Sequence, residues 1–130
     1  MKIVGIDLGK FKSEVCDMDS ATKKHEFETL ATSPEALRKL LEKRHPDRGV
    51  FGIGNQAGWV TDLVEELKLE YQVANTNREI WQWNRTRTKT DRRDALKLVT
   101  LSMLDSVPLV HIPSAAVRRR RELIRYRQVL

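Results

Sequence analysis

At 130 residues, of which 40% are hydrophobic, the chain has the size and composition of one globular domain with a hydrophobic core. No apolar run approaches the ~20 residues that span a bilayer, which excludes a transmembrane protein, and the first residues lack a signal-peptide cleavage site. The single cysteine excludes an internal disulfide, so we expect a protein of the reducing cytoplasm.

The net charge of +6 is concentrated in the second half of the chain. Residues 1–77 carry 11 Lys and Arg against 13 Asp and Glu, whereas residues 78–130 carry 13 against 5. A basic half beside a nearly neutral half indicates a polyanionic partner, with nucleic acid as the first candidate. The alternative is a solvated basic surface that binds no partner.

Residues 1–31 predict three strands that follow one another closely. Apolar and β-branched side chains predict a buried strand over residues 2–8, which ends in a turn at Gly9-Lys10. A second strand is expected over residues 11–18 and a third over residues 25–31. The short connections between these segments predict an antiparallel meander.

Residues 33–74 predict alternating helices and strands. Ser33 as the N-cap and Pro34 at the first helical position start a helix with three inward leucines, and His45-Pro46 ends it. The segments after it are, in order, a strand over residues 49–54, a helix over 59–69 and a strand over 71–74.

Helices are also expected in the remainder of the chain. A short one is predicted around residues 79–83 and a longer one over 91–104, and Ser114 caps a last helix after a connector through Val110. This order of elements is that of the RNase H-like fold. We therefore predict an α/β protein with a mixed five-stranded sheet and helices on both of its faces.

Asp7 is the first candidate for a functional residue. It ends an apolar strand between two glycines, Gly5 and Gly9, where burial of a carboxylate is costly unless the carboxylate is paired or binds a metal ion. Glycines on both sides allow a ligand or another backbone to approach closely. The alternative is a turn aspartate that helps to close the hairpin.

Asp91 and Asp94 form the second candidate group. At positions i and i+3 of a predicted helix they share one face, and their mutual repulsion is relieved by a cation between them. Mg²⁺ suits this role, because it takes one or two carboxylates and keeps water or phosphate oxygens as its other ligands. Alternatively, Asp91 only caps the helix, with Thr90 as the competing cap.

Aromatic and basic residues alternate just before this helix. Trp81 and Trp83 are followed by Arg85, Arg87 and Lys89, a mixture that suits stacking on bases and neutralisation of phosphates. The alternative is that one or both tryptophans pack over the edge of the sheet.

Several segments together carry a family resemblance over essentially the whole chain. They are Gly5–Lys10, Ala57–Val60, Val73–Asn77, Lys89–Lys97 and Arg121–Arg127. On these segments the chain resembles the N-terminal part of the DEDD transposases of bacterial insertion sequences, of the insertion-sequence one-ten type and related to the Piv invertases.

The resemblance implies a RuvC-type, RNase H-like domain over residues 1–112. Residues 113–130 would then start a basic linker helix towards a C-terminal domain with a nucleophilic serine, which we expect to be missing here. In the family, an Asp-Glu-Asp-Asp set binds divalent metal, and the protein acts on DNA with a structured guide RNA. Asp7 matches the first aspartate of the set, and Asp91 and Asp94 match the last two.

The chain departs from the family at the glutamate. Alignment on Ala57-Gly58-Trp59 puts Gly52 in its place, and residues 50–57 contain no acid. Asn55 or Gln56 would supply only a neutral oxygen, which offsets less of the free energy needed to dehydrate a cation. We therefore expect weak binding of a single Mg²⁺ or Mn²⁺ and no strand cleavage by this chain alone.

The sequence thus predicts a bacterial, cytoplasmic DNA-transposase domain for metal-dependent strand cleavage and transfer, with DNA as its partner and a homo-oligomer as the full-length state. One alternative is a non-catalytic nucleic-acid-binding remnant of a transposase. Another, a sugar-kinase-like ATPase domain, also opens with Gly-x-Asp-x-Gly but needs a much longer chain. The residues expected to bind the nucleic-acid backbone are Arg85, Arg87, Lys89, Arg92, Arg93, Arg118, Arg119, Arg120 and Arg121.

Overall fold

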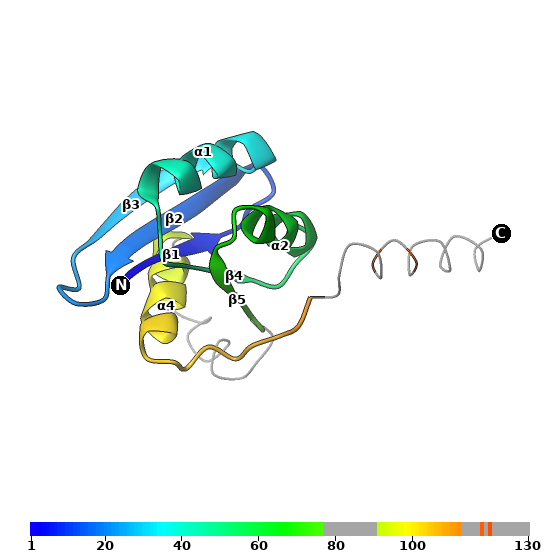
Figure 1. Ribbon diagram of the computed structural model, residues 1–130. Coiled ribbons are helices and arrows are strands. Elements are labelled where there is room, and N and C mark those ends of the chain that lie inside the picture. Colours follow the sequence, from blue (N-terminus) through cyan, green and yellow to red (C-terminus); the bar gives the residue numbers. More distant parts are fainter. Residues whose placement is uncertain (77–90, 113–117, 119, 121–130) are drawn as a thin grey trace.

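The computed structural model of the protein describes residues 1–76, 91–112, 118 and 120 (Figure 1). Five strands form one mixed sheet in the order β3-β2-β1-β4-β5. The strands are β1 (Lys2–Asp7), β2 (Lys12–Asp19), β3 (His25–Ala31), β4 (Arg48–Gly52) and β5 (Glu70–Ala74), and the helices are α1 (Pro34–Arg44), α2 (Ala57–Glu66) and α4 (Asp91–Met103).

The first three strands form the expected antiparallel meander, and the rest of the sheet is parallel. β1 pairs antiparallel with β2, and β2 with β3, whereas β1 and β4, and β4 and β5, run parallel. The carboxyl ends of β1, β4 and β5 therefore lie at one edge of the sheet, where open α/β sheets bind their ligands.

The turn between β1 and β2 lies one residue later than Gly9-Lys10. Asp7 pairs with Glu14, so the tip of the hairpin is formed by Lys10 and Phe11. Gly9 approaches the carbonyl oxygen of Lys12 so closely that it leaves no room for a side chain. The later turn moves the pairing of the two strands by two residues, so each β2 side chain stays on the expected face of the sheet. Glu14, and not Lys12, then lies opposite Asp7.

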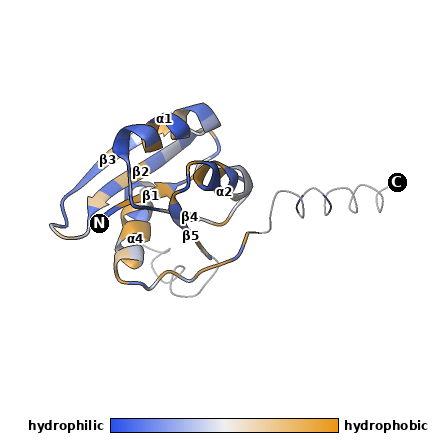
Figure 2. Cartoon of the chain, in the orientation of Figure 1, coloured by the Kyte–Doolittle hydropathy of each residue, from blue (hydrophilic) through white to orange (hydrophobic). Residues whose placement is uncertain are grey.

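Helices α1 and α2 cover one face of the sheet and α4 covers the other (Figure 1), as predicted. The N-cap of α1 is Ser33, whose side-chain oxygen accepts a hydrogen bond from the Ala36 N–H at 3.2 Å. The helix ends before His45, which adopts the left-handed conformation. Figure 2 shows hydrophobic residues along β1 and α4, in keeping with their mutual burial.

The segment between β4 and α2 differs from its prediction. β4 ends at Gly52, two residues early, and α2 starts at Ala57, two residues before Trp59. The Gly54 carbonyl accepts a hydrogen bond from the Ala57 N–H at 3.1 Å, so the chain leaves the sheet in a turn. That turn brings the residues after β4 to the same edge as Asp7.

The connector after α4 covers the edge strand β5. The Asn75 N–H donates to the Pro108 carbonyl at 2.6 Å, and the Val110 N–H donates to the Val73 carbonyl at 3.0 Å. This pairing protects an edge that would otherwise expose its hydrogen-bonding groups. The helix predicted around residues 79–83 and most of the helix predicted from Ser114 lie outside the described residues. Each described helix is too short or too polar to cross a membrane.

Candidate active site

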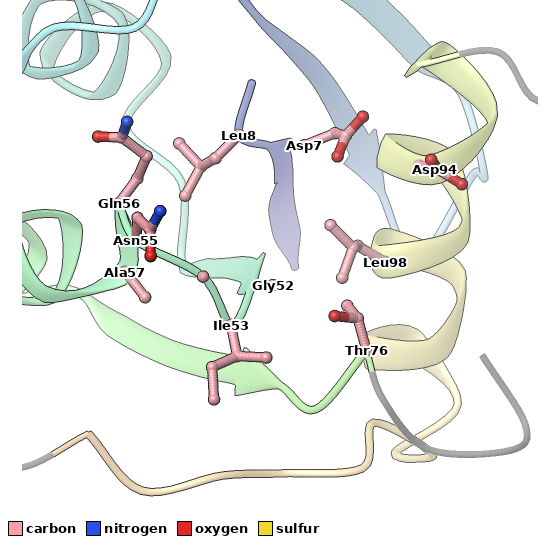
Figure 3. Close-up of a pocket in the computed structure, with 11 residues that line it drawn as sticks. Asp7, Leu8, Gly52, Ile53, Asn55, Gln56, Ala57, Thr76, Asp94 and Leu98 are labelled. Carbon is pink, nitrogen blue, oxygen red and sulfur yellow. The ribbon is translucent and has the colours of Figure 1, made fainter. Parts of the chain in front are cut away.

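A cavity of about 170 Å³ opens at the carboxyl ends of β1 and β4 (Figure 3). Asp7, the last residue of β1, lines it together with Asp94 from the first turns of α4. In Figure 3 the Asp7 side chain extends from β1 towards α4. The remaining lining residues are Leu8, Gly52, Ile53, Gly54, Asn55, Gln56, Ala57, Thr76 and Leu98.

Two of the three acids predicted as metal ligands therefore share one cavity. The third, Asp91, is the first residue of α4, but its side chain is outside the described part of the structure. Among the side chains that are described, no three His, Cys, Asp or Glu residues lie close enough together to hold a metal ion. The convergence of Asp7, Asp91 and Asp94 on one ion stays a prediction.

A partly buried cation accompanies Asp94 on α4. Burial lowers the pKa of Lys97, and the carboxylate of Asp94 opposes that shift. Lys97 thus lies where water is partly excluded, one helical turn from the acid. Such a lysine balances negative charge near the cavity more strongly than a fully solvated one.

The cavity wall after β4 carries no acid. A β-carbon added to Gly52 would lie 3.0 Å from the Cγ2 of Thr76, whereas one added to Gly54 would meet open space. The Gln56 Oε1 accepts a hydrogen bond from the Trp59 indole N–H at 2.5 Å. The side chain of Asn55 is exposed. This wall offers neutral oxygens at the position where the resemblance led us to expect a glutamate.

Glu14 is a further acid near Asp7 that the sequence interpretation missed. It lies opposite Asp7 in the β1–β2 register, and only 15% of its side chain is exposed. Its Oε1 accepts a hydrogen bond from the Thr29 hydroxyl at 2.5 Å, and its Oε2 lies 4.0 Å from the Arg92 Nε. The alternation of β2 places Glu14 on the α4 face, but only the later turn places it opposite Asp7.

Arg92 and Arg93 were predicted to bind phosphate, and both are exposed at the start of α4. The Arg92 guanidinium also lies over the ring of Phe27, 5.6 Å from its centroid. Together with the Glu14 carboxylate, this ring holds Arg92 close to β2 and β3. The first turn of α4 is thereby attached to the meander.

Arg118, another predicted phosphate ligand, contacts α2. Its Nη2 lies 2.6 Å from the Oδ2 of Asp62, and a β-carbon on Gly58 would lie 3.2 Å from its Nε. The glycine therefore gives the guanidinium room to pass close to the helix. Arg120 is exposed. The other predicted nucleic-acid contacts lie outside the described residues: Trp81, Trp83, Arg85, Arg87, Lys89, Arg119 and Arg121.

The fold is similar to that of a solved structure described as Thermus thermophilus RuvC. The two share 13% sequence identity with a TM-score of 0.52, over 85% of this chain and 100% of that chain. This similarity establishes the RuvC-type, RNase H-like fold that the order of elements predicted.

The family is decided by the sequence. A family model described as Transposase, for the DEDD transposases of the insertion-sequence one-ten type, matches residues 4–130. The chain belongs to this DEDD transposase family. No curated protein sequence matches it. In this member of the family, Asp7 and Asp94 line the cavity, and Gly52 and Gly54 form the part of the wall beside β4.

Proposed function

We propose that this domain performs metal-dependent cleavage and transfer of DNA strands in transposition, and that residues 1–130 by themselves are inactive. The observation that carries the proposal is the shared cavity of Asp7 and Asp94 at the carboxyl edge of the sheet, in a chain of the transposase family. The site thus combines carboxylates with the edge of the sheet at which open α/β sheets bind their ligands.

The oxygen donors of the cavity suit a divalent cation. The carboxylates of Asp7 and Asp94 and the hydroxyl of Thr76 are the hard ligands that Mg²⁺ and Mn²⁺ prefer, and we propose that Asp91 completes the set. Such an ion, when bound, would activate the attacking oxygen and stabilise the leaving one. With few carboxylates to offset the cost of dehydration, we expect a single weakly held ion.

Exposed cations near Asp94 support DNA as the substrate. Arg92 and Arg93 lie next to the acid on α4 and would hold the phosphates on either side of the reacting one. We propose that the remaining predicted cations, from Arg85 to Lys89 and from Arg118 to Arg121, extend this surface. By the family resemblance, a structured guide RNA and a second copy of the protein would be further partners, in the bacterial cytoplasm.

A second candidate function is nucleic-acid binding without catalysis. The wall formed by Gly52, Gly54, Asn55 and Gln56 favours it, because no acid is present there to hold a second ion. The two functions differ in their need for metal: the binding remnant would bind DNA without taking up Mn²⁺ at Asp7.

Two measurements on the chain test both candidates. Fluorescence anisotropy with duplex DNA should show an affinity that falls with salt at a log–log slope of about −0.9 per phosphate contact. Calorimetry should show weak Mn²⁺ uptake that Asp7→Asn and Asp94→Asn each abolish. DNA binding with no Mn²⁺ uptake would favour the non-catalytic binding function. Mn²⁺ uptake that persists in both variants, or no DNA binding at 50 mM salt, would overturn the proposal.

A further inference from the structure

The tip of the β1–β2 hairpin exposes an aromatic ring. Phe11 is 76% exposed, more than any other large hydrophobic side chain in the described part of the chain. Exposure of a phenyl ring to water is unfavourable, at about 25 cal/mol per Å² of apolar surface. A ligand that covers the Phe11 ring would therefore gain binding free energy from its burial.

The backbone that carries the ring is firmly held. The Thr32 N–H donates to the Phe11 carbonyl at 2.9 Å, and the hydroxyls of Thr32 and Ser13 are hydrogen-bonded at 2.6 Å. These bonds attach the hairpin tip to the segment before α1. The exposure of Phe11 therefore belongs to a fixed turn, which presents the ring in one place at little cost in entropy on binding.

The neighbours of the ring are cationic. Lys10 and Lys12 flank Phe11 and are exposed, and the Lys10 Nζ lies 5.3 Å from the centroid of the ring. A protein partner would be expected to cover a contiguous apolar patch. A single ring between two lysines is instead the combination that binds single-stranded nucleic acid, by stacking on a base and neutralising phosphates.

The hairpin tip is also close to the cavity. Asp7 pairs with Glu14, and Lys10 and Phe11 at the tip each lie three residues further along the hairpin, which is about 10 Å at 3.4 Å per residue. This distance corresponds to about three stacked nucleotides. A strand whose phosphate lies at Asp7 would therefore bring a nearby base to Phe11.

We propose that Phe11 is a stacking platform for an unpaired nucleobase beside the reacting phosphate, with Lys10 and Lys12 neutralising the adjacent backbone. The inference rests on the proposed function and adds to it that the domain holds its substrate as a locally single strand at this edge. The partner is a nucleic acid strand, recognised without regard to base identity.

The test uses the chain of residues 1–130 and a fluorescein-labelled single-stranded DNA oligonucleotide. Phe11→Ala should weaken binding about 5- to 150-fold, the range for loss of one stacked base. Because no charge is lost, the salt slope should be unchanged, whereas Lys10→Ala should reduce it by about 0.7. Phe11→Tyr should bind like the wild type. Leu104→Ala, which truncates another exposed hydrophobic side chain just beyond the far end of α4, should have no effect.

An abasic nucleotide moved along the oligonucleotide gives a second readout. At one position the abasic nucleotide should weaken binding to the wild type but not to Phe11→Ala, because that variant already lacks the contact with the missing base. If Phe11→Ala binds like the wild type, or if the chain binds only duplex DNA, the stacking contact is overturned while the proposed function stands. If the wild type binds no DNA at all, both are overturned.

Discussion

Gly5 of β1 lies so close to Ala95 of α4 that a β-carbon on the glycine would be 2.6 Å from the Ala95 carbonyl oxygen. This β-carbon would also lie 2.6 Å from the Cγ2 of Val99. Helix α4 therefore packs directly on the backbone of β1. Asp94 precedes Ala95, so this approach brings its side chain to the cavity that Asp7 lines.

Replacement of Gly5 should disturb both the fold and the site. In Gly5→Ala the methyl group meets a backbone oxygen that cannot rotate away, so α4 has to move, at a cost of about 1–3 kcal/mol in the free energy of unfolding. Urea denaturation measures this cost. Gly49→Ala is the matched control, because a methyl group on that buried strand glycine meets no atom within 4 Å. Equal stability of the two variants would contradict the close packing of α4.

A carboxylate restored after β4 should tighten metal binding. Gly54 lines the cavity, and the β-carbon of Gly54→Glu would meet no atom within 4 Å. No glycine of the described chain has a positive φ that would strain the change. We expect Mn²⁺ affinity by calorimetry to rise on the order of tenfold, through the added negative charge. Gly52→Glu should act in the same direction, but the Thr76 methyl group has to shift first.

Gly54→Gln is the matched control for this gain, because it has the same shape without the charge. It should leave Mn²⁺ affinity nearly unchanged. If neither glutamate variant raises the affinity while both remain folded, residues 52–54 do not face the ion, and our placement of the missing glutamate is wrong.

Asp62 should compete with DNA for Arg118. Asp62→Asn removes the carboxylate that lies 2.6 Å from the guanidinium, so DNA affinity at low salt should rise by up to about fivefold, the range of an exposed ion pair. Glu66→Gln removes the same charge from α2 but releases Arg38 instead, and should give a smaller increase. Equal increases would indicate a general effect of charge and no role for Arg118.

Cys16 should be unreactive in the folded protein. Burial, and secondarily the charge of Asp17, raises the pKa of its thiol to about 11. Between about pH 9 and pH 11 the folded state retains the thiol proton that the unfolded state has lost. The contribution of Cys16 to the free energy of unfolding therefore falls as the pH rises through this range. Iodoacetamide labelling at pH 8 should be slow without denaturant and rapid in urea. Rapid labelling of the folded chain would contradict the burial of β2.

Much of the fold followed from short stretches of sequence. Ser33, Pro34 and three spaced leucines predicted α1 correctly, because a helix cap and an apolar stripe are properties of neighbouring residues. The meander and the parallel strands followed from the order of elements. The family resemblance then pointed to Asp7 and Asp94, which the structure places at one cavity.

Other features depended on contacts between distant residues. The turn at Lys10 and Phe11 was missed because Gly9-Lys10 is an equally good local turn, and the packing of Thr32 against the tip accompanies the later one. The position of Glu14 opposite Asp7 follows from that choice of register. The pairing of Arg118 with Asp62 was likewise invisible in a run of four arginines. Local patterns determined which segments became helices and strands, whereas only tertiary packing decided which charges face the site.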